Sequence, residues 1–457
     1  MSLSLRLYQL QAISDLRLAY RDGARAPLLV LPTGGGKTIV MAEILRTLAT
    51  RGRSALVLVH RRELIRQTGA KLHLAGVEHG IIAAGHPPAA APVQVASVQT
   101  LVRRLAAVAT PPDLIVLDEA HHATAGSWAR VLGHWPDAIR LGVTATPARL
   151  DGRGLSAVFD RLVLGPSVAD LIDAGFLSPS RIYAPPQRAD LSQLRKRAGE
   201  FAAGDAAIAM DRPTVTGDAI EHYTRLAPGQ PAIAFCCTVD HAEHVAASFR
   251  SAGYRATTLL GNTPTEQRDQ LVADFAAGQV QVLVTVDVVS EGFDVPAASC
   301  AILLRPTASL GLYLQQVGRV LRPAAGKAAA TILDHVGNVH RHGFPDDYRD
   351  WSLEDGARRS RGPGAAAPSV RTCPECFAAF KPAPHCPFCG AQCAPIKSRA
   401  IRQLAGELQE LRRQEMRAAR IAQGSARTLS QLLVIAKERG YSPGWAYKVH
   451  NARSRSA

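Results

Sequence analysis

The sequence lacks the features of an exported or membrane-embedded protein. It contains no run of about 20 uninterrupted apolar residues, the length that a spanning helix needs, and residues 1–6 do not resemble a signal peptide. Without an export signal, the eight cysteines are expected to be reduced rather than paired in disulfides. We therefore expect a cytoplasmic enzyme with no membrane partner, and 457 residues are enough to bury two full-sized cores.

Acidic residues are scarce relative to basic ones. The chain has 53 Lys and Arg against 38 Asp and Glu, which gives a formal net charge of +15. Residues 394–457 alone hold thirteen Lys and Arg but only four Glu. This imbalance predicts a polyanionic partner such as nucleic acid, and it makes the tail a candidate site for nucleic acid or an acidic partner.

A glycine-rich loop follows the apolar run at residues 27–31 and precedes a helix-like stretch at residues 39–50. Glycines let such a loop turn its backbone N–H groups toward an anion, and the helix adds its positive N-terminal end. We expect Lys37 to contact the β/γ-phosphates of a nucleotide and the Thr38 hydroxyl to hold Mg²⁺. Leu31 stands where the usual motif has its first glycine, so an ordinary strand-to-helix turn is the alternative. The predicted nucleotide-binding residues are Thr33, Gly34, Gly35, Gly36, Lys37 and Thr38.

Two adjacent carboxylates follow a second buried-strand pattern, at residues 113–117. Burial of two carboxylates is costly unless a cation accompanies them. Asp118 is predicted to hold Mg²⁺, and Glu119 to polarise the water that attacks the γ-phosphate. A solvated strand end is the alternative.

Two arginines lie three residues apart in the sequence Gln315-Gln316-Val317-Gly318-Arg319-Val320-Leu321-Arg322, which continues an apolar helix start. Residues at this spacing share a helix face. Arg319 and Arg322 could therefore both reach a transferring phosphoryl group and stabilise its charge. A basic, solvated helix face is the alternative.

With these motifs the chain resembles the DEAD/DEAH-box helicases of superfamily 2, over about residues 5–335. Residues 5–9 are similar to the adenine-reading segment, and residues 59–64, 97–100, 144–147, 234–238 and 284–294 to further motifs of that family. The resemblance implies two RecA-like lobes, an ATP site with Mg²⁺, and Arg319 and Arg322 as arginine fingers. It also implies that Gln9 reads the base, that Gly292 and Asp294 border the nucleotide, and that these residues face nucleic acid: His60, Arg61, Gln99, Thr100, Thr238 and Thr285.

Strand-length apolar runs alternate with helical stretches in two series, which predicts two doubly wound parallel sheets with helices on both faces. The expected strands are residues 28–31, 54–59, 93–96, 114–117 and 139–143, then 232–235, 255–260, 280–285, 300–304 and 328–333. We expect a first lobe at 1–177, a connection at 178–215, a second lobe at 216–342, a linker at 343–371, a zinc module at 372–394 and a basic helical tail at 395–457. The basic run Arg195-Lys196-Arg197 in the connection is expected to be a solvated loop.

Four cysteines form two CxxC pairs separated by nine residues, a spacing typical of zinc knuckles. The predicted Zn²⁺ ligands are Cys373, Cys376, Cys386 and Cys389, with Cys393 and His385 as spare candidates that we expect not to bind. A redox pair of cysteines is the alternative. Cys236, Cys237 and Cys300 sit in strand-like runs and are expected in the core.

The tail predicts an arginine-rich amphipathic helix at residues 398–422, a short helix beginning near Leu432, and an aromatic turn with Trp445 and Tyr447. With the zinc segment it resembles the end of RadD-type bacterial repair helicases, which implies DNA repair or recombination and repair-protein partners. The favoured hypothesis is an ATP-dependent DNA helicase or translocase whose lobes close on ATP. An RNA helicase, a duplex translocase without strand separation, and a non-catalytic nucleic-acid scaffold are the alternatives.

Overall fold

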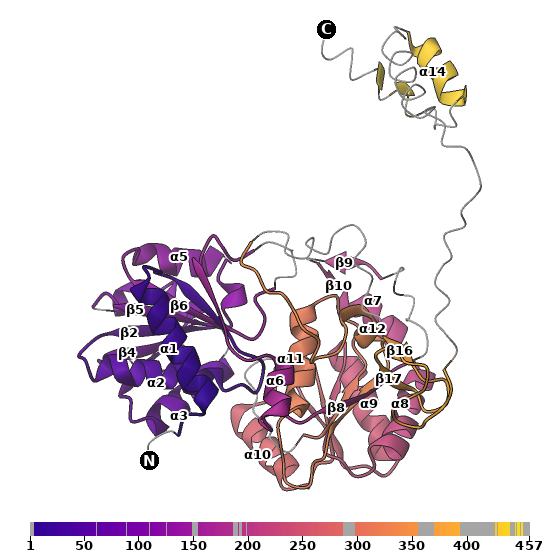
Figure 1. Ribbon diagram of the computed structural model, residues 1–457, viewed down its shortest axis with the longest axis horizontal. Coiled ribbons are helices and arrows are strands. Elements are labelled where there is room, and N and C mark those ends of the chain that lie inside the picture. Colours follow the sequence, from indigo (N-terminus) through magenta and orange to yellow (C-terminus); the bar gives the residue numbers. More distant parts are fainter. Residues whose placement is uncertain are drawn as a thin grey trace. The chain divides into compact units, whose positions relative to one another are not determined.

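A computed structural model describes residues 4–393 except 61, 88, 109, 125, 149–153, 186–190, 192–193, 198, 287–297 and 355–369. It also describes 426, 428–438, 444, 446–447 and 449–450. The chain divides into two units, Met1–Pro395 and Ile396–Ala457, which are taken separately below (Figure 1). In the described part of the chain, no helix has the length and apolar character needed to cross a membrane.

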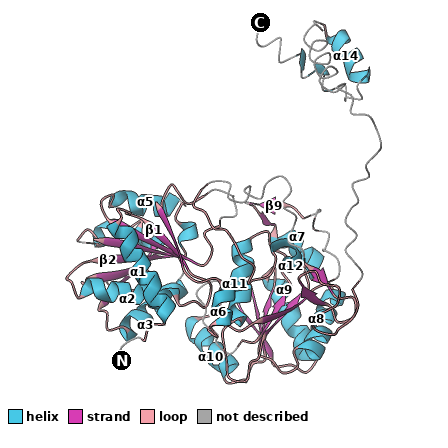
Figure 2. Cartoon of the chain, viewed as in Figure 1, coloured by secondary structure: helices cyan, strands magenta, loops and turns pink. Residues whose placement is uncertain are grey.

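The first lobe is a seven-stranded sheet with the strand order β3-β4-β2-β5-β6-β1-β7, and all of its strand pairs are parallel. Helices lie on both faces of this sheet (Figure 2). Its elements are α1 (Leu7–Arg21), β1 (Pro27–Val30), α2 (Lys37–Ala49), β2 (Ala55–Val59), α3 (Arg62–Leu74), β3 (His79–Ile82), β4 (Val93–Ser97), α4 (Val98–Leu101), β5 (Leu114–Asp118), α5 (Gly126–His134), β6 (Ile139–Thr144) and β7 (Arg161–Leu164).

Alternation along the strands explains why both faces are covered. Val57 and Val59 of β2 join one core cluster with α1, α2 and α3, whereas Leu56 and Leu58 join a second cluster with α4 and α5. Successive strand side chains point to opposite faces, so a strand of consecutive apolar residues needs a helical layer on each side. The doubly wound α/β lobe expected from the sequence is confirmed.

The second lobe is an eight-stranded sheet with the strand order β12-β13-β11-β14-β15-β8-β17-β16. The first six strands are parallel and the last two are antiparallel. Its elements are α6 (Val168–Asp173), β8 (Ser180–Tyr183), β9 (Lys196–Arg197), β10 (Glu200–Phe201), α7 (Ala203–Met210), α8 (Pro213–Leu226), β11 (Ala232–Phe235), α9 (Val239–Ser251), β12 (Ala256–Leu259), α10 (Thr265–Ala276), β13 (Val282–Thr285), β14 (Cys300–Leu303), α11 (Leu310–Val320), β15 (Ala330–Asp334), α12 (Asn338–His342), β16 (Arg371–Thr372) and β17 (Ala378–Phe380).

The structure assigns parts of the expected connection and zinc module to the second sheet. Strand β8, inside the stretch expected to be a connection, pairs with β15. Strand β17, between the two cysteine pairs, then pairs with β8 through Ala379 and Ile182. The zinc segment therefore extends the edge of the second sheet by two short strands. Ile182, Ala378 and Ala379 supply buried apolar side chains at this pairing, and such short apolar stretches are not enough to recognise strands in the sequence.

The expected linker also begins with ordered structure. Leu353 accepts hydrogen bonds at its carbonyl from the N–H groups of Leu155 (2.7 Å) and Ser156 (3.0 Å), and Trp351 packs against the first-lobe core. The chain thus returns to the first lobe after it has completed the second. The remainder of the expected linker, 355–369, lies outside the described residues.

The second unit contains helix α14 (Leu429–Glu438), which agrees with the short helix expected near Leu432. Leu432, Ala436 and Ala446 form a small buried cluster there. The expected helix at 398–422 and the side chain of Trp445 lie outside the described residues.

Candidate ATP site and nucleic-acid face

Strand order brings the predicted catalytic segments to one edge of the first sheet. Strands β5, β6 and β1 are neighbours and run parallel, so their carboxyl ends lie side by side. The glycine loop follows β1, Asp118 ends β5 and Thr144 ends β6. Ligands of open α/β sheets bind at this edge.

The glycine loop is held from behind by the start of α1. The Tyr8 hydroxyl and Gln9 Nε2 donate to the carbonyl of Gly35, at 3.0 and 3.4 Å. Gly36 begins α2 in the left-handed region, with φ of 82°, and a Cβ there would lie 2.3 Å from Gln9 Nε2. Only glycine fits this position. Gln9, predicted to read the base, is buried and supports the loop in this structure.

Leu31, the irregular first position of the loop motif, is fully buried in the core beneath it. Its N–H donates to the carbonyl of Thr144 (3.0 Å), and its own carbonyl accepts from Lys37 Nζ at 3.5 Å. An apolar residue here anchors the loop to the sheet, because its side chain removes apolar surface from water.

Lys37 lies within a compact cluster of charges from both lobes. Burial lowers the pKa of its ammonium group. The carboxylates of Glu119 and Asp118 oppose that shift, and the guanidinium groups of Arg319 and Arg322 reinforce it. The charges of these four groups therefore reach Lys37, so the five residues predicted to be catalytic lie in one region of the structure.

The two carboxylates are buried, with Asp118 only 4% exposed and Glu119 7%. The N–H of Glu119 donates to Asp118 Oδ1 at 3.0 Å. Glu119 adopts φ of 50°, a left-handed conformation that is costly for a residue other than glycine and is typical of strained functional sites. Its Oε2 accepts no hydrogen bond from the described residues, although His121 Nδ1 lies 3.4 Å away. A buried acceptor without a donor suits a carboxylate that orients a water molecule.

His121 joins the carboxylates to the segment after β6. Its Nδ1 lies 3.2 Å from Thr144 Oγ1, and that hydroxyl donates to the carbonyl of Thr146 at 3.0 Å. The loop after β6 is thereby tied to Glu119. The sequence alone does not reveal this contact.

Helix α11 of the second lobe lies directly on these first-lobe loops. A Cβ on Gly318 would lie 2.5 Å from Thr33 Cβ, and one on Gly311 would lie 2.9 Å from Thr146 Oγ1. The Arg322 side chain approaches Gly34, and burial lowers its pKa. The lobes therefore meet at the loop that was predicted to bind phosphate.

Lys327 is a supporting residue that sequence reasoning missed. It donates to the carbonyls of Ala298 (3.0 Å), Arg322 (2.8 Å) and Val320. The positive charge of Lys327 stabilises the C-terminal end of α11, where the peptide dipoles leave partial negative charge. The available signal was a basic residue shortly after the end of a predicted helix.

Comparison with known proteins agrees with this geometry. Residues 2–149 match the family model "Type III restriction enzyme, res subunit", and residues 217–324 match "Helicase conserved C-terminal domain". A 51.5 kDa protein of a Lactococcus phage is 34% identical over 388 residues, which cover 84% of this chain and 82% of that protein. The putative ATP-dependent helicase IRC3 of Saccharomyces cerevisiae is 30% identical, over 73% of this chain and 51% of the relative. The chain belongs to the superfamily 2 helicases.

The same fold occurs in solved structures. A fragment of a putative HsdR subunit of a type I restriction enzyme from Vibrio vulnificus aligns with a TM-score of 0.59 at 22% identity, over 75% of this chain and 66% of that fragment. This helicase is an ATP-hydrolysing enzyme of its superfamily, with two RecA-like lobes. It spans most of the phage relative but about half of the yeast one.

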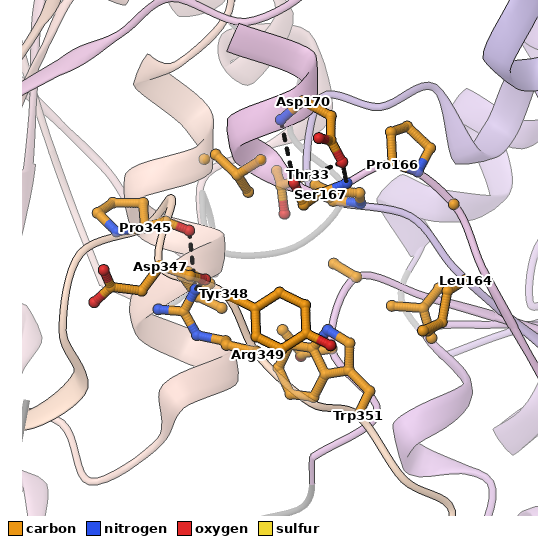
Figure 3. Close-up of a pocket in the computed structure, with 18 of the residues that line it drawn as sticks. Thr33, Leu164, Pro166, Ser167, Asp170, Pro345, Asp347, Tyr348, Arg349 and Trp351 are labelled. Atoms are coloured by element: carbon orange, nitrogen blue, oxygen red, sulfur yellow. Dashed lines mark hydrogen bonds between the residues drawn. The ribbon is translucent and has the colours of Figure 1, made fainter. Parts of the chain in front are cut away.

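A cavity of about 350 Å³ lies beside the glycine loop, between the lobes of the helicase (Figure 3). Thr33 and Ser167 line one side, and Tyr348 and Trp351 of the segment that returns to the first lobe line the other. Lys37 and the two carboxylates do not line it. The cavity is therefore adjacent to the charged cluster and distinct from it.

The four predicted zinc ligands converge, with all four Sγ atoms within 4.8 Å of one another. The Sγ atoms of Cys373 and Cys389 are 3.6 Å apart, and those of Cys376 and Cys386 are 3.7 Å apart. A tetrahedral Zn²⁺ with bonds of about 2.3 Å requires sulfur separations of about 3.8 Å. Burial alone would raise the pKa of Cys373, but hydrogen bonds from the backbone at Cys376 and Glu375 lower it to about 7. The donor set thus fits zinc.

Cys393 lies beside the cluster but is not one of its four converging cysteines. Its Sγ donates to the carbonyl of Ala391 at 3.5 Å. His385 pairs with Gln392 in a β-bridge. Cys236, Cys237 and Cys300 are buried in the second lobe, as expected.

The predicted nucleic-acid contacts of the first lobe share one edge of the sheet because β4, β2 and β5 are neighbours. Gln99 Nε2 donates to the carbonyl of His60 at 3.2 Å, and the His60 ring lies 4.6 Å from that of His122. Gln99 is exposed, whereas His60 and Thr100 are half-buried. Arg61, Gly292 and Asp294 lie outside the described residues.

The two predicted contacts of the second lobe have structural roles instead. Thr285 is fully buried and donates its hydroxyl to the carbonyl of Leu259 at 2.9 Å, so it cannot face a nucleic-acid backbone in this structure. Thr238 caps α9 by accepting from the N–H of His241 at 3.3 Å. Both hydroxyls satisfy the backbone of the lobe itself.

Proposed function

We propose that this helicase uses ATP hydrolysis to translocate along DNA, or to separate or remodel its strands, in repair or recombination. The observation that carries the proposal is the charged cluster around Lys37, where two carboxylates of the first lobe meet two arginines of the second. Such a cluster matches the charge distribution of a nucleotide with Mg²⁺ that is held between two lobes.

Each residue of the cluster has a role in this proposal. The backbone of the glycine loop and Lys37 bind the phosphates, while Thr38 and Asp118 would hold Mg²⁺, which when bound neutralises charge on the phosphate oxygens. Glu119 orients the attacking water through Oε2, which accepts no hydrogen bond from the described residues. Arg319 and Arg322 stabilise charge on the transferring phosphoryl group, and Gln9 supports the loop and reads the base.

Closure of the lobes would couple hydrolysis to movement. Arg319 and Arg322 reach Lys37 only because α11 lies on the loops that carry Thr33 and Thr146. If ATP favours this contact and hydrolysis releases it, the nucleic-acid contacts of the two lobes shift relative to each other. Distances between labels on the two lobes in the free, ATP-analogue and ADP states test this step, and identical distances in all three would contradict it.

DNA is the favoured polymer, and an RNA helicase is the alternative. A restriction-modification enzyme of this fold, LlaBIII, has DNA bound in its structure. The basic excess of the chain and the resemblance of its tail to RadD-type helicases support DNA repair, with repair proteins as partners of the tail. The four-cysteine cluster is proposed to hold a structural Zn²⁺. An enzyme that moves along duplex DNA without separating its strands is a further alternative.

The decisive experiment measures ATP turnover with single-stranded DNA, duplex DNA, forked DNA and RNA. We expect DNA to stimulate turnover most, and we expect the Lys37→Ala and Glu119→Gln variants to lose turnover by about 100-fold or more. Strand-displacement and translocation assays on the stimulating polymer then separate unwinding from movement alone. Stimulation by RNA that equals the stimulation by DNA would favour the RNA helicase alternative. Turnover that no polymer changes, or that survives the loss of Lys37, would refute the proposal.

A further inference from the structure

The basic run at residues 195–197 forms part of a β-hairpin that the ATP site does not use. Strands β9 and β10 pair through Lys196 with Phe201 and Arg197 with Glu200, and we call residues 195–202 the basic hairpin. It lies next to α7 in the second lobe (Figure 1). The sequence predicts a solvated loop here, whereas the structure shows an antiparallel pair that is anchored at both ends.

The base of the basic hairpin is fixed to α7. Arg195 forms a bidentate ion pair with Asp205, with both N···O distances at 2.8 Å, and its carbonyl accepts from the N–H of Ala202 at 2.8 Å. Bidentate arginine–carboxylate pairs hold a defined geometry. The charge of Arg195 is therefore used within the protein, and the hairpin leaves the lobe in a fixed direction.

The second strand of the basic hairpin is fixed to the loop before α11. Glu200 Oε2 accepts from the Thr307 hydroxyl at 2.6 Å, and Glu200 Oε1 accepts from the N–H of Ala308 at 2.7 Å. Next to it, Phe201 is buried beneath the guanidinium of Arg341, which lies 5.3 Å from the ring centroid. The hairpin thus contacts the second lobe through a carboxylate clamp and an aromatic anchor.

The clamped loop leads directly into α11, which carries Arg319 and ends two residues before Arg322. The Thr307 hydroxyl accepts from the N–H of Ser309 at 2.9 Å, and the Ser309 hydroxyl caps α11 by accepting from the N–H of Leu312 at 3.1 Å. One residue into α11, Gly311 contacts Thr146 of the first lobe. A shift of the hairpin would therefore move the start of α11, and a helix transmits such a shift along its length to Arg319.

Two positive charges of the basic hairpin face solvent. Lys196 and Arg197 are both exposed, and neither forms an ion pair with the described residues. The Lys196 ammonium lies 5.3 Å from the centroid of the Phe201 ring, and Phe201 also holds Arg341. Two exposed cations on a short hairpin that is fixed to the lobe suit contact with the phosphates of a nucleic-acid backbone.

We propose that the basic hairpin is a nucleic-acid contact of the second lobe, and that Glu200 transmits occupancy of this contact to α11 and to the arginines at its C-terminal end, Arg319 and Arg322. The proposal rests on the proposed function, since it assumes that a polymer stimulates ATP turnover. Lys196 and Arg197 bind the phosphate backbone. Glu200 is a positioning residue that acts through Thr307 and Ala308.

The test measures ATP turnover against polymer concentration at several salt concentrations, with single-stranded DNA as the probe. For the Lys196→Ala/Arg197→Ala variant we expect the half-saturating DNA concentration to rise roughly tenfold at low salt. Its salt dependence should also be shallower, by about 1.4 in log–log slope for two lost contacts with a single strand. The Arg17→Ala/Arg21→Ala variant on α1 removes the same charge from exposed positions and should match the unmodified helicase.

Variants of Glu200 separate coupling from binding. Glu200→Ala should leave the affinity for DNA, measured by fluorescence anisotropy, within about twofold, but it should reduce the stimulation of turnover by between about 2- and 30-fold. Glu200→Gln keeps an oxygen for the N–H of Ala308 and an amide for the Thr307 hydroxyl, so it should restore most of the stimulation. A purely structural role would lower the melting temperature without this split between binding and stimulation.

The outcomes are distinct. If the unmodified helicase shows no stimulation by DNA, the proposed function fails and the hairpin proposal fails with it. If DNA stimulates turnover but the Lys196→Ala/Arg197→Ala variant behaves like the α1 control, the hairpin is not a contact and the proposed function stands. If Glu200→Ala retains full stimulation, Glu200 does not transmit the signal.

Discussion

The contact between Gly318 and Thr33 gives the sharpest prediction about how the lobes work together. Gly318→Ala would place a Cβ 2.5 Å from Thr33 Cβ and 2.8 Å from its Cγ2. Carbon atoms in good contact are about 3.5–4.0 Å apart, so α11 would have to move away from the glycine loop by about 1 Å. Arg319, the next residue along the helix, would move with it.

The magnitude follows from the cost of overpacking, about 1–3 kcal/mol for an added methyl group in a tight contact. Because each 1.4 kcal/mol changes an equilibrium tenfold, the arrangement with both lobes in contact should become about 5- to 140-fold less favourable. ATP turnover at saturating ATP and DNA should fall within that range. Each lobe should still fold, since alanine stabilises a helix by about 1 kcal/mol relative to glycine.

The assay compares turnover and thermal unfolding with those of a matched glycine substitution. Gly217→Ala lies in α8 of the same lobe, where an added Cβ meets nothing within 4 Å, and it should leave turnover unchanged. Combining Gly318→Ala with Thr33→Gly removes the clashing atoms, so the double variant should be more active than the two single effects predict. Full activity of Gly318→Ala would show that the observed lobe contact is absent from the active enzyme.

Three further predictions concern the zinc cluster, Lys327 and the ion pair between the lobes. Metal analysis should find about one zinc per chain, lost in Cys373→Ser and retained in Cys393→Ser; a folded, zinc-free protein would contradict the site. Burial lowers the pKa of Lys327 from 10.5 to about 8, so the unfolded chain binds more protons between these values. Unfolding free energy should therefore rise with pH across this window, and Lys327→Met should remove that part of the rise in denaturation titrations. Arg66 and Asp269 form an ion pair across the lobes at 2.5 Å, and both side chains are about half exposed. Arg66→Ala should therefore change ATP turnover by less than about fivefold, and the change should be smaller at high salt. A larger loss of turnover would show that this ion pair holds the lobes together during catalysis.

Long apolar strands and loop motifs were the predictable part of this chain. The ten expected strands all form, because strand-length apolar runs between turns are readily buried in a doubly wound sheet that helices cover on both faces. The positions of Lys37, Asp118 and Glu119 followed from the strands that precede them. Strand β8 was not predictable. Ile182 is the one aliphatic residue among its four, and the strand pairs with β15 and β17, which are far away in sequence.

The roles of polar side chains that can bind either a ligand or the protein itself were not predictable. The Thr285 hydroxyl looks like a surface contact in the sequence, but at the end of a fully buried strand it donates to the nearest carbonyl, that of Leu259. Gln9 occupies the position of a base-reading residue, yet its amide also holds the glycine loop. When a side chain can either bind a ligand or form a hydrogen bond with the protein's own backbone, its neighbours in the fold decide its role. The sequence does not show those neighbours.

The sequence by itself indicated the chemistry of this helicase: a glycine loop with Lys37, an acidic pair after a buried strand, two arginines three residues apart, and four cysteines at zinc spacing. These signals are local, because each depends on residues a few positions apart. The structure ends α11 at Val320, so only Arg319 lies on the helix. The tertiary structure alone decided how α11 meets the glycine loop, how the zinc segment extends the second sheet, and how Glu200 joins the basic hairpin to the loop before α11. Those contacts join residues that are distant in sequence, and only the packing of both lobes brings them within hydrogen-bond or van der Waals distance.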